Sequence, residues 1–143
     1  MKKKIIEFND FTFKYRVQAK PTLKNINLTI YEGEKALIVG PSGSGKSTLA
    51  HCINGLTPFY YQGTSTGSLK VMGKETKDMG IFEMSKMVGT VLQDPDSQFI
   101  GLTVAEDIAF KLENDCVPQS KMKAMVEKVS KLVGIEKQLD AAP

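Results

Sequence analysis

Apolar and polar residues alternate in two segments near the N-terminus, residues 5–15 and 26–30. This alternation is typical of strands that bury one face and leave the other in water. The first segment is rich in Ile, Phe and Thr, and an Asn-Asp pair at 9–10 interrupts it, which predicts a turn or bulge between two strand halves. We therefore expect residues 1–34 to form a small antiparallel β portion.

Residues 36–39 form a short, wholly apolar run, the pattern of a strand buried on both faces of a parallel sheet. We expect a second buried strand at 87–92 and another strand at 68–72. Residues 57–67 contain Pro, Gly, Ser and Thr and favour a loop. The pattern thus predicts that a parallel core follows the antiparallel portion.

Helical periodicity dominates the C-terminal third, at residues 104–113 and 119–133. In the second of these segments methionine, valine and leucine fall on one face and lysine on the other, as in a helix that packs against its own domain. Shorter helices are expected at 47–54, ending at Gly55, and at 81–86.

Composition and charge change this picture little. The chain has 143 residues with 41% apolar and 24% charged residues, which suits one soluble globular domain. The net charge of +3 comes from lysines spread along the chain, and without a concentrated basic stripe we expect no nucleic-acid partner. The run Lys2–Lys4 is expected to be a solvated terminus, with contact to anionic lipid as the alternative.

The sequence contains no window with the ~18 apolar residues that a transmembrane helix needs, and the apolar residues after Lys4 are too few for a signal peptide. We therefore expect a cytoplasmic protein. Cys52 and Cys116 lie far apart and show no CxxC spacing, so we expect two reduced thiols.

A glycine-rich segment between the apolar run 36–39 and the expected helix 47–54 matches the P-loop pattern G-x-x-x-x-G-K-[ST]. Its glycines let the backbone turn so that successive N–H groups can point at phosphates, and the following helix adds its N-terminal partial positive charge. The alternative, that the glycines only form a tight turn, would not explain the Lys-Ser pair that follows them. We predict that ATP or GTP, with Mg²⁺, binds at Gly40, Pro41, Ser42, Gly43, Ser44, Gly45, Lys46, Ser47 and Thr48.

Three of these side chains have distinct predicted roles. Lys46 is a candidate catalytic residue that reaches the β- and γ-phosphates as a point charge, and the hydroxyl of Ser47 completes the Mg²⁺ shell. Thr48 is expected to donate to the α-phosphate. The P-loop by itself does not separate kinases, GTPases and transporter ATPases.

Three further segments resemble the nucleotide-binding subunits of ABC transporters: Tyr15 before a polar loop, residues 23–28, and residues 89–95. This resemblance implies that Tyr15 stacks on adenine, which favours ATP over GTP. It also implies that Gln93 senses Mg²⁺ and the γ-phosphate, as a metal ligand and a second candidate catalytic residue. The alternatives are a core aromatic residue for Tyr15 and a solvated loop amide for Gln93.

More specifically, residues 54–56, 93–99 and 103–110 resemble the ATPase components of energy-coupling factor importers, which take up vitamins or cobalt and nickel ions. The resemblance implies a second ATP-binding subunit, identical or different, and a transmembrane transporter component as partners. It places the chain at the cytoplasmic face of the membrane. The carboxylates of Asp94, Asp96 and Asp107 are expected to be surface charges without a catalytic role.

The family continues with a Leu-Ser-Gly-Gly-Gln signature, a second acidic strand, a catalytic glutamate and a switch histidine, and this chain stops before all four. We expect an incomplete α/β P-loop NTPase of the ABC type. Its parts would be the antiparallel β portion at 1–34, a P-loop core at 35–93, and the glutamine loop with the start of the helical subdomain at 94–143.

Hydrolysis needs a base, a positioned water and charge stabilisation that the P-loop supplies only in part. The chain is therefore expected to bind ATP without efficient turnover. Uncovered apolar strand edges are expected to make it marginally stable or to make it self-associate. The alternative is a fragment that binds ATP or a partner and has no catalytic activity. A small-molecule or nucleoside kinase is disfavoured, since it would need its own lid and acceptor pocket and the loop at Gln93 argues against it.

Overall fold

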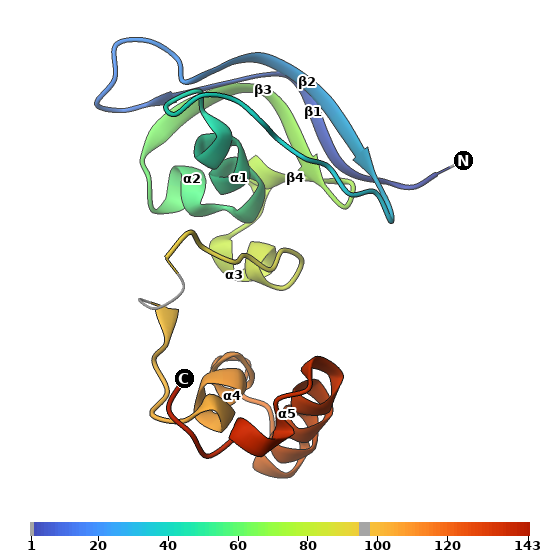
Figure 1. The fold of residues 1–143 in the computed structure, drawn as a ribbon. Helices are drawn as coiled ribbons and strands as arrows, with labels where there is room; N and C mark the ends of the chain where they lie inside the picture. Colours follow the sequence, from blue (N-terminus) through green and yellow to red (C-terminus); the bar gives the residue numbers. More distant parts are fainter. Residues whose placement is uncertain (1, 95–97) are drawn as a thin grey trace. The chain divides into compact units, whose positions relative to one another are not determined.

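The computed structural model describes residues 2–94 and 98–143 and divides the chain into two compact units, Met1–Thr90 and Val91–Pro143. The first unit holds the sheet and the P-loop, and the second holds two packed helices (Figure 1).

The sheet of the first unit is antiparallel and has the order β2-β1-β3-β4. Its strands are β1 Lys4–Tyr15, β2 Leu23–Tyr31, β3 Gly63–Val71 and β4 Lys74–Glu75. The alternating pattern therefore predicted β1 and β2 correctly. The loop predicted for 57–67 is wrong in its second half, because Gly63–Gly67 belongs to β3 and pairs with the end of β1.

The interruption predicted in β1 is confirmed as an irregularity in the pairing with both neighbours. The register shifts between Phe8 and Phe11 on one side and between Asn9 and Thr12 on the other. Asp10 has φ +47°, and Gly67 opposite it has φ +79°. A Cβ on Gly67 would lie 2.3 Å from the Asp10 carbonyl oxygen, so this bulge requires glycine there.

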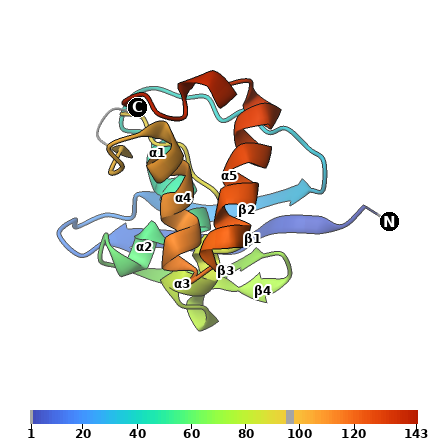
Figure 2. The same cartoon turned by 90° about the horizontal axis from the view of Figure 1, so that it is seen from below.

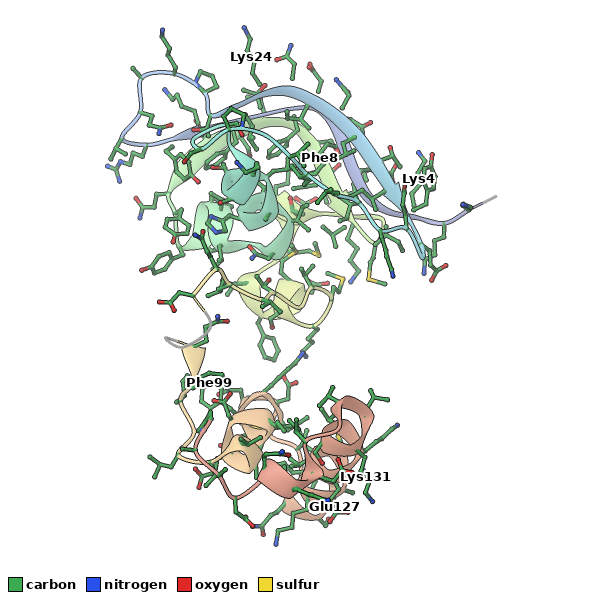
Figure 3. All side chains as sticks on the ribbon, in the orientation of Figure 1. Lys4, Phe8, Lys24, Phe99, Glu127 and Lys131 are labelled. Carbon is green, nitrogen blue, oxygen red and sulfur yellow. The ribbon has the colours of Figure 1, made fainter. Side chains whose placement is uncertain are left out.

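Two helices, α1 Lys46–Asn54 and α2 Leu56–Phe59, cover one face of the sheet (Figure 1). Figure 3 shows Phe8 on this inner face, whereas Lys24 points away from the outer face. The inner face carries the core of the unit, in which alternate residues of β1 meet apolar residues of α1 and β3. The core residues are Phe8, Phe11, Phe13, Leu23, Leu49, Cys52 and Leu69.

A smaller cluster lies beyond β3, where η1 Thr76–Asp78 and α3 Ile81–Ser85 follow the sheet. Val71, Met79 and Met84 are buried there, and the partly buried Met87 and Val88 pack against them. The short helix predicted at 81–86 is thus confirmed, and it anchors the end of the first unit.

The two predicted parallel strands are wrong as secondary structure, since residues 36–39 and 87–92 form no strand. Leu37 is 87% exposed and Val39 is 78% exposed. A parallel strand needs neighbouring strands for its N–H and C=O groups, and no described strand pairs with either segment. Residues 34–41 therefore run back from β2 to the start of α1 without regular structure (Figure 1).

The second unit is built on α4 Val104–Asn114 and α5 Gln119–Val133, which lie side by side (Figures 1 and 2). Both helices begin at the residues predicted from periodicity. Thr103 and Glu106 form a reciprocal capping box at the start of α4. On α5 Val126 is buried, whereas Leu132, on the same predicted apolar face, is 83% exposed.

The short η3 Glu136–Gln138 closes the unit. After it the chain returns to α4, where the Val104 and Ala105 amides donate to the carbonyls of Ala141 and Leu139, both at 2.9 Å. Among the described residues, no helix combines the length and apolar composition that a bilayer crossing requires.

Candidate nucleotide-binding site

The P-loop, residues 40–48, runs from the end of the irregular segment 34–41 into the first turn of α1, and Gly45 is the last residue before the helix. Gly45 has φ +94° and Gly43 has φ +78°, a left-handed backbone that L side chains rarely adopt. A Cβ on Gly45 would also lie 3.1 Å from Leu23 Cδ2 and 3.3 Å from the Thr22 carbonyl oxygen. A larger residue here would press on Thr22 and Leu23 and would also have to adopt the left-handed backbone, so both features favour glycine.

Lys46 folds its side chain back over the loop that precedes it. Its Nζ donates to the carbonyl oxygens of Gly40 at 2.9 Å and Pro41 at 2.8 Å. The Ser44 amide donates to the Pro41 carbonyl at 3.2 Å and closes the turn between them. The ammonium group thus sits against the loop backbone, in reach of any anion that the loop encloses.

The start of α1 supplies further donors. Leu49 is the first residue whose amide donates within the helical turn, to the Gly45 carbonyl at 2.9 Å. Helix geometry leaves the amides of the preceding residues without intrahelical acceptors, and the helix dipole makes this end attractive to anions. The loop residues Pro41, Ser42, Gly43 and Ser44 are exposed, so a phosphate chain can approach from solvent. These features fit the binding of a nucleoside triphosphate.

Ser47 is exposed at the first turn of α1, and Thr48 is 6% exposed on the side that faces the sheet. The Ser47 hydroxyl is a hard oxygen ligand of the kind that Mg²⁺ accepts beside phosphate oxygens. The Thr48 hydroxyl pairs instead with Tyr15, at 2.9 Å between Oγ1 and Oη. A hydroxyl donates one hydrogen bond and accepts others, so this pairing is compatible with donation to a phosphate.

Tyr15 ends β1 beside α1 and is half-buried. Its ring meets Phe13 edge to face, with centroids 4.9 Å apart, and it meets Tyr61 in the same manner at 6.5 Å. Tyr15 also packs against the main core. The position of Tyr15 is therefore compatible with both hypotheses, a core aromatic residue and a residue that stacks on adenine. Stacking on adenine stays a prediction.

Gln93 belongs to the second unit and is exposed. Its role in binding Mg²⁺ and sensing the γ-phosphate stays a prediction. Asp94 is exposed, and Asp96 lies outside the described residues. Asp107 has a structural contact, since its Oδ1 accepts from the amides of Ile100 at 2.9 Å and Gly101 at 3.2 Å.

The sequence interpretation assigned no binding role to His51 or to Tyr61, and Tyr61 meets Tyr15. His51 of α1 stacks on Tyr61, with ring centroids 5.0 Å apart and planes 16° apart. Burial lowers the pKa of His51 from its ordinary value, which favours the neutral ring. The available signal was the pair of adjacent aromatic residues Tyr60 and Tyr61 in a polar segment.

A cavity of about 480 Å³ opens next to the end of β1, lined by Lys14, Arg16, Gln62 and Thr64 among others. It is not at the P-loop. Arg16 Nη1 donates to Gln62 Oε1 at 3.1 Å within this lining, so the hollow is partly closed by its own side chains. We assign the phosphate site to the P-loop on its chemistry.

The sequence profile of the ABC transporter family matches residues 23–143. The chain is 73% identical over 142 residues to a protein of Clostridium perfringens (strain 13 / Type A) whose given name describes an ABC transporter ATP-binding protein. It is 61% identical over 143 residues to a protein of the same description from Enterococcus faecalis (strain ATCC 700802 / V583). These alignments cover 99% and 100% of this chain but 25% of each relative, so the chain spans about a quarter of their length.

The fold resembles the solved structure of CbiO1 from Clostridium perfringens, which is part of the ABC transporter complex CbiONQ. The TM-score is 0.82 at 29% sequence identity, over 98% of this chain and 54% of that one. The match covers the sheet, the P-loop and the helical unit together, with about half of the CbiO1 chain beyond it. The chain therefore belongs to the ABC transporter family, and its fold is part of that family's ATP-binding domain.

Proposed function

We propose that this chain is the nucleotide-gripping part of the ATPase component of an energy-coupling factor importer. In that role it binds ATP and Mg²⁺, and the assembled transporter couples ATP binding and hydrolysis to uptake of a vitamin or metal ion. The likeness to CbiO1, part of the CbiONQ complex, supports this importer type.

The observation that carries the proposal is the position of Lys46 at the start of α1. Its Nζ is held by the carbonyls of Gly40 and Pro41 at 2.9 and 2.8 Å. A triphosphate in the loop offers the ammonium charged oxygens in place of neutral carbonyls, and charge-assisted hydrogen bonds are about twice as strong as neutral ones. Lys46 therefore gains from exchanging these acceptors for the β- and γ-phosphates.

The other predicted residues complete this site in our proposal. Ser47 and Gln93 would hold Mg²⁺, which would supply positive charge to offset that of the triphosphate. Tyr15 stacks on adenine, and Thr48 donates to the α-phosphate. The backbone donors at Gly43 and Gly45 orient the triphosphate.

We further propose that the chain acts with a second ATP-binding subunit, identical or different, and docks on a transmembrane component at the cytoplasmic face of the membrane. By itself the 143-residue chain binds ATP without efficient turnover, because the P-loop supplies charge stabilisation but no general base.

The test is calorimetric titration of the chain with ATP and Mg²⁺, with phosphate release measured in parallel. Lys46→Ala removes the ammonium group, and Lys24→Ala is the matched control because Lys24 lies exposed on the outer face of the sheet (Figure 3). We expect binding by the wild type and by Lys24→Ala, with affinity reduced at least tenfold in Lys46→Ala, about 1.4 kcal/mol.

Equal ATP affinity in the wild type and Lys46→Ala would contradict a P-loop site. Phosphate release that depends on Lys46 would instead keep the site and overturn the claim that the chain alone lacks efficient turnover. Binding without release supports the proposal as stated.

A further inference from the structure

We propose that Tyr61, backed by His51, is a positioning residue for Tyr15 and thereby sets how the site recognises the base of the nucleotide. This inference rests on the proposed function, in which Tyr15 meets adenine. It concerns a pair of side chains outside the P-loop pattern.

The backbone brings Tyr61 to Tyr15. Tyr15, the last residue of β1, pairs with Gly63, the first residue of β3. Arg16, which follows Tyr15, and Gln62, which precedes Gly63, continue the contact, since the Arg16 amide donates to the Gln62 carbonyl at 3.0 Å. Tyr61 directly precedes this pairing, so its place beside Tyr15 is fixed by the sheet.

The other end of Tyr61 is fixed as well. Its amide donates to the Leu56 carbonyl of α2 at 2.8 Å. Tyr61 is 40% exposed, and its ring contacts three others. The ring centroids of Tyr15 and Tyr60 lie 6.5 and 4.8 Å away, both edge to face, and that of His51 lies 5.0 Å away in a stack. A ring held on several sides can in turn limit the orientations of Tyr15.

Helix α1 links this aromatic group to the phosphate end of the site. Thr48 and His51 are three residues apart, so they share one face of the helix that begins at Lys46. Thr48 bonds the hydroxyl of Tyr15 at 2.9 Å, and His51 stacks on Tyr61. The same helix therefore holds both tyrosines and presents Lys46 to the triphosphate.

His51 is suited to a packing role by its protonation state. Its Nδ1 is buried without a hydrogen-bond partner among the described residues, and burial lowers its pKa from the ordinary value. A neutral imidazole stacks flat on a phenol ring without carrying a charge into the contact. His51 thus packs against Tyr61 and holds its ring in place, and Tyr61 in turn restricts the orientation of Tyr15.

The experiment compares ATP with inorganic triphosphate, which has no base, by calorimetry with Mg²⁺. Tyr61→Leu removes the ring, and Tyr61→Phe keeps it. Phe82→Leu is the matched control, since Phe82 is an exposed aromatic residue of α3 that stands in none of these ring contacts. Thermal melting of each variant checks that the fold is retained.

We expect ATP affinity to fall about fivefold in Tyr61→Leu, the scale of one aromatic pair, with triphosphate affinity unchanged. Tyr61→Phe and Phe82→Leu should stay within about twofold of the wild type. His51→Leu should show the same selective loss at about half the logarithmic size, because it acts through Tyr61.

Unchanged ATP affinity in Tyr61→Leu overturns the inference, and so does an equal loss for ATP and triphosphate, which would indicate a merely structural role. These outcomes leave the proposed function intact if Lys46→Ala still reduces ATP affinity at least about tenfold. A wild-type chain that does not bind ATP overturns the proposed function, and this inference falls with it.

Discussion

The antiparallel sheet and the segment 36–39 are both apolar in sequence, yet only the sheet buries its apolar side chains. Phe8 and Phe13 are each 1% exposed, whereas Leu37 and Val39 are 87% and 78% exposed. Each strand of the sheet finds an antiparallel neighbour within the described chain, but no described strand pairs with 36–39. An apolar pattern thus shows what a segment is suited to bury, and burial itself depends on the partners present.

The largest expected effect is on the free energy of unfolding, which should fall for a substitution in the sheet and hardly change for one in segment 36–39. Phe8→Ala should reduce the free energy of unfolding by about 3–5 kcal/mol, because it leaves a cavity among Phe11, Leu69 and their neighbours. Val39→Ala should change it by less than about 0.5 kcal/mol, as expected for an exposed side chain. Urea titration measures both, and a comparable loss in Val39→Ala would show that segment 36–39 packs in solution.

A second, smaller effect tests the junction between the sheet and the P-loop. Gly45→Ala places a Cβ against Leu23 in a left-handed backbone, and Gly33→Ala is the matched control, with φ +76° but nothing within 4 Å. The backbone penalty in each is about 1–2 kcal/mol. Gly45→Ala alone should also weaken ATP binding, at least about tenfold by calorimetry.

Equal ATP affinity in the Gly33 and Gly45 variants would contradict the tight contact between Gly45 and the sheet. Loss of ATP binding in both would show that backbone strain anywhere in the unit disrupts the site, and the sheet would no longer be its specific support.

The smallest effect concerns His51, a half-buried residue of α1. Its pKa is lowered by burial, so the unfolded chain takes up this proton at a higher pH than the folded chain. The contribution of neutral His51 to stability is therefore complete above its ordinary pKa of 6.5 and is lost as the pH falls below it. His51→Phe should lose less melting temperature than the wild type between pH 7.5 and 5.5, and parallel losses in both proteins would refute this.

The sequence predicted the parts of the fold that depend on local pattern. Alternation in 5–15 gave β1 and its bulge, and periodicity in 119–133 gave α5 with both of its ends. The P-loop was predictable because glycine, lysine and serine at fixed spacing have few other uses. These features are set by residues within a few positions of one another.

The parts that the sequence could not give depend on contacts between distant segments. The strand at Gly63–Gly67 is poor in apolar residues and forms because it pairs with the end of β1. Likewise, the contact between Tyr15 and Thr48 spans 33 positions, and that between His51 and Tyr61 joins a helix to a loop. The pattern of residues within one segment cannot predict which distant segment it will contact.

The most direct test of the account is hydrogen exchange of the backbone amides, measured with and without ATP and Mg²⁺. Amides of β1 and β3 should exchange at least ~100-fold more slowly than those of residues 35–45 in the free chain, as expected for paired strands beside an irregular segment. ATP with Mg²⁺ should then slow exchange at residues 40–48, and Lys46→Ala should abolish that change. Strand-like protection of 36–39 in the free chain, or no response of 40–48 to ATP, would contradict the account.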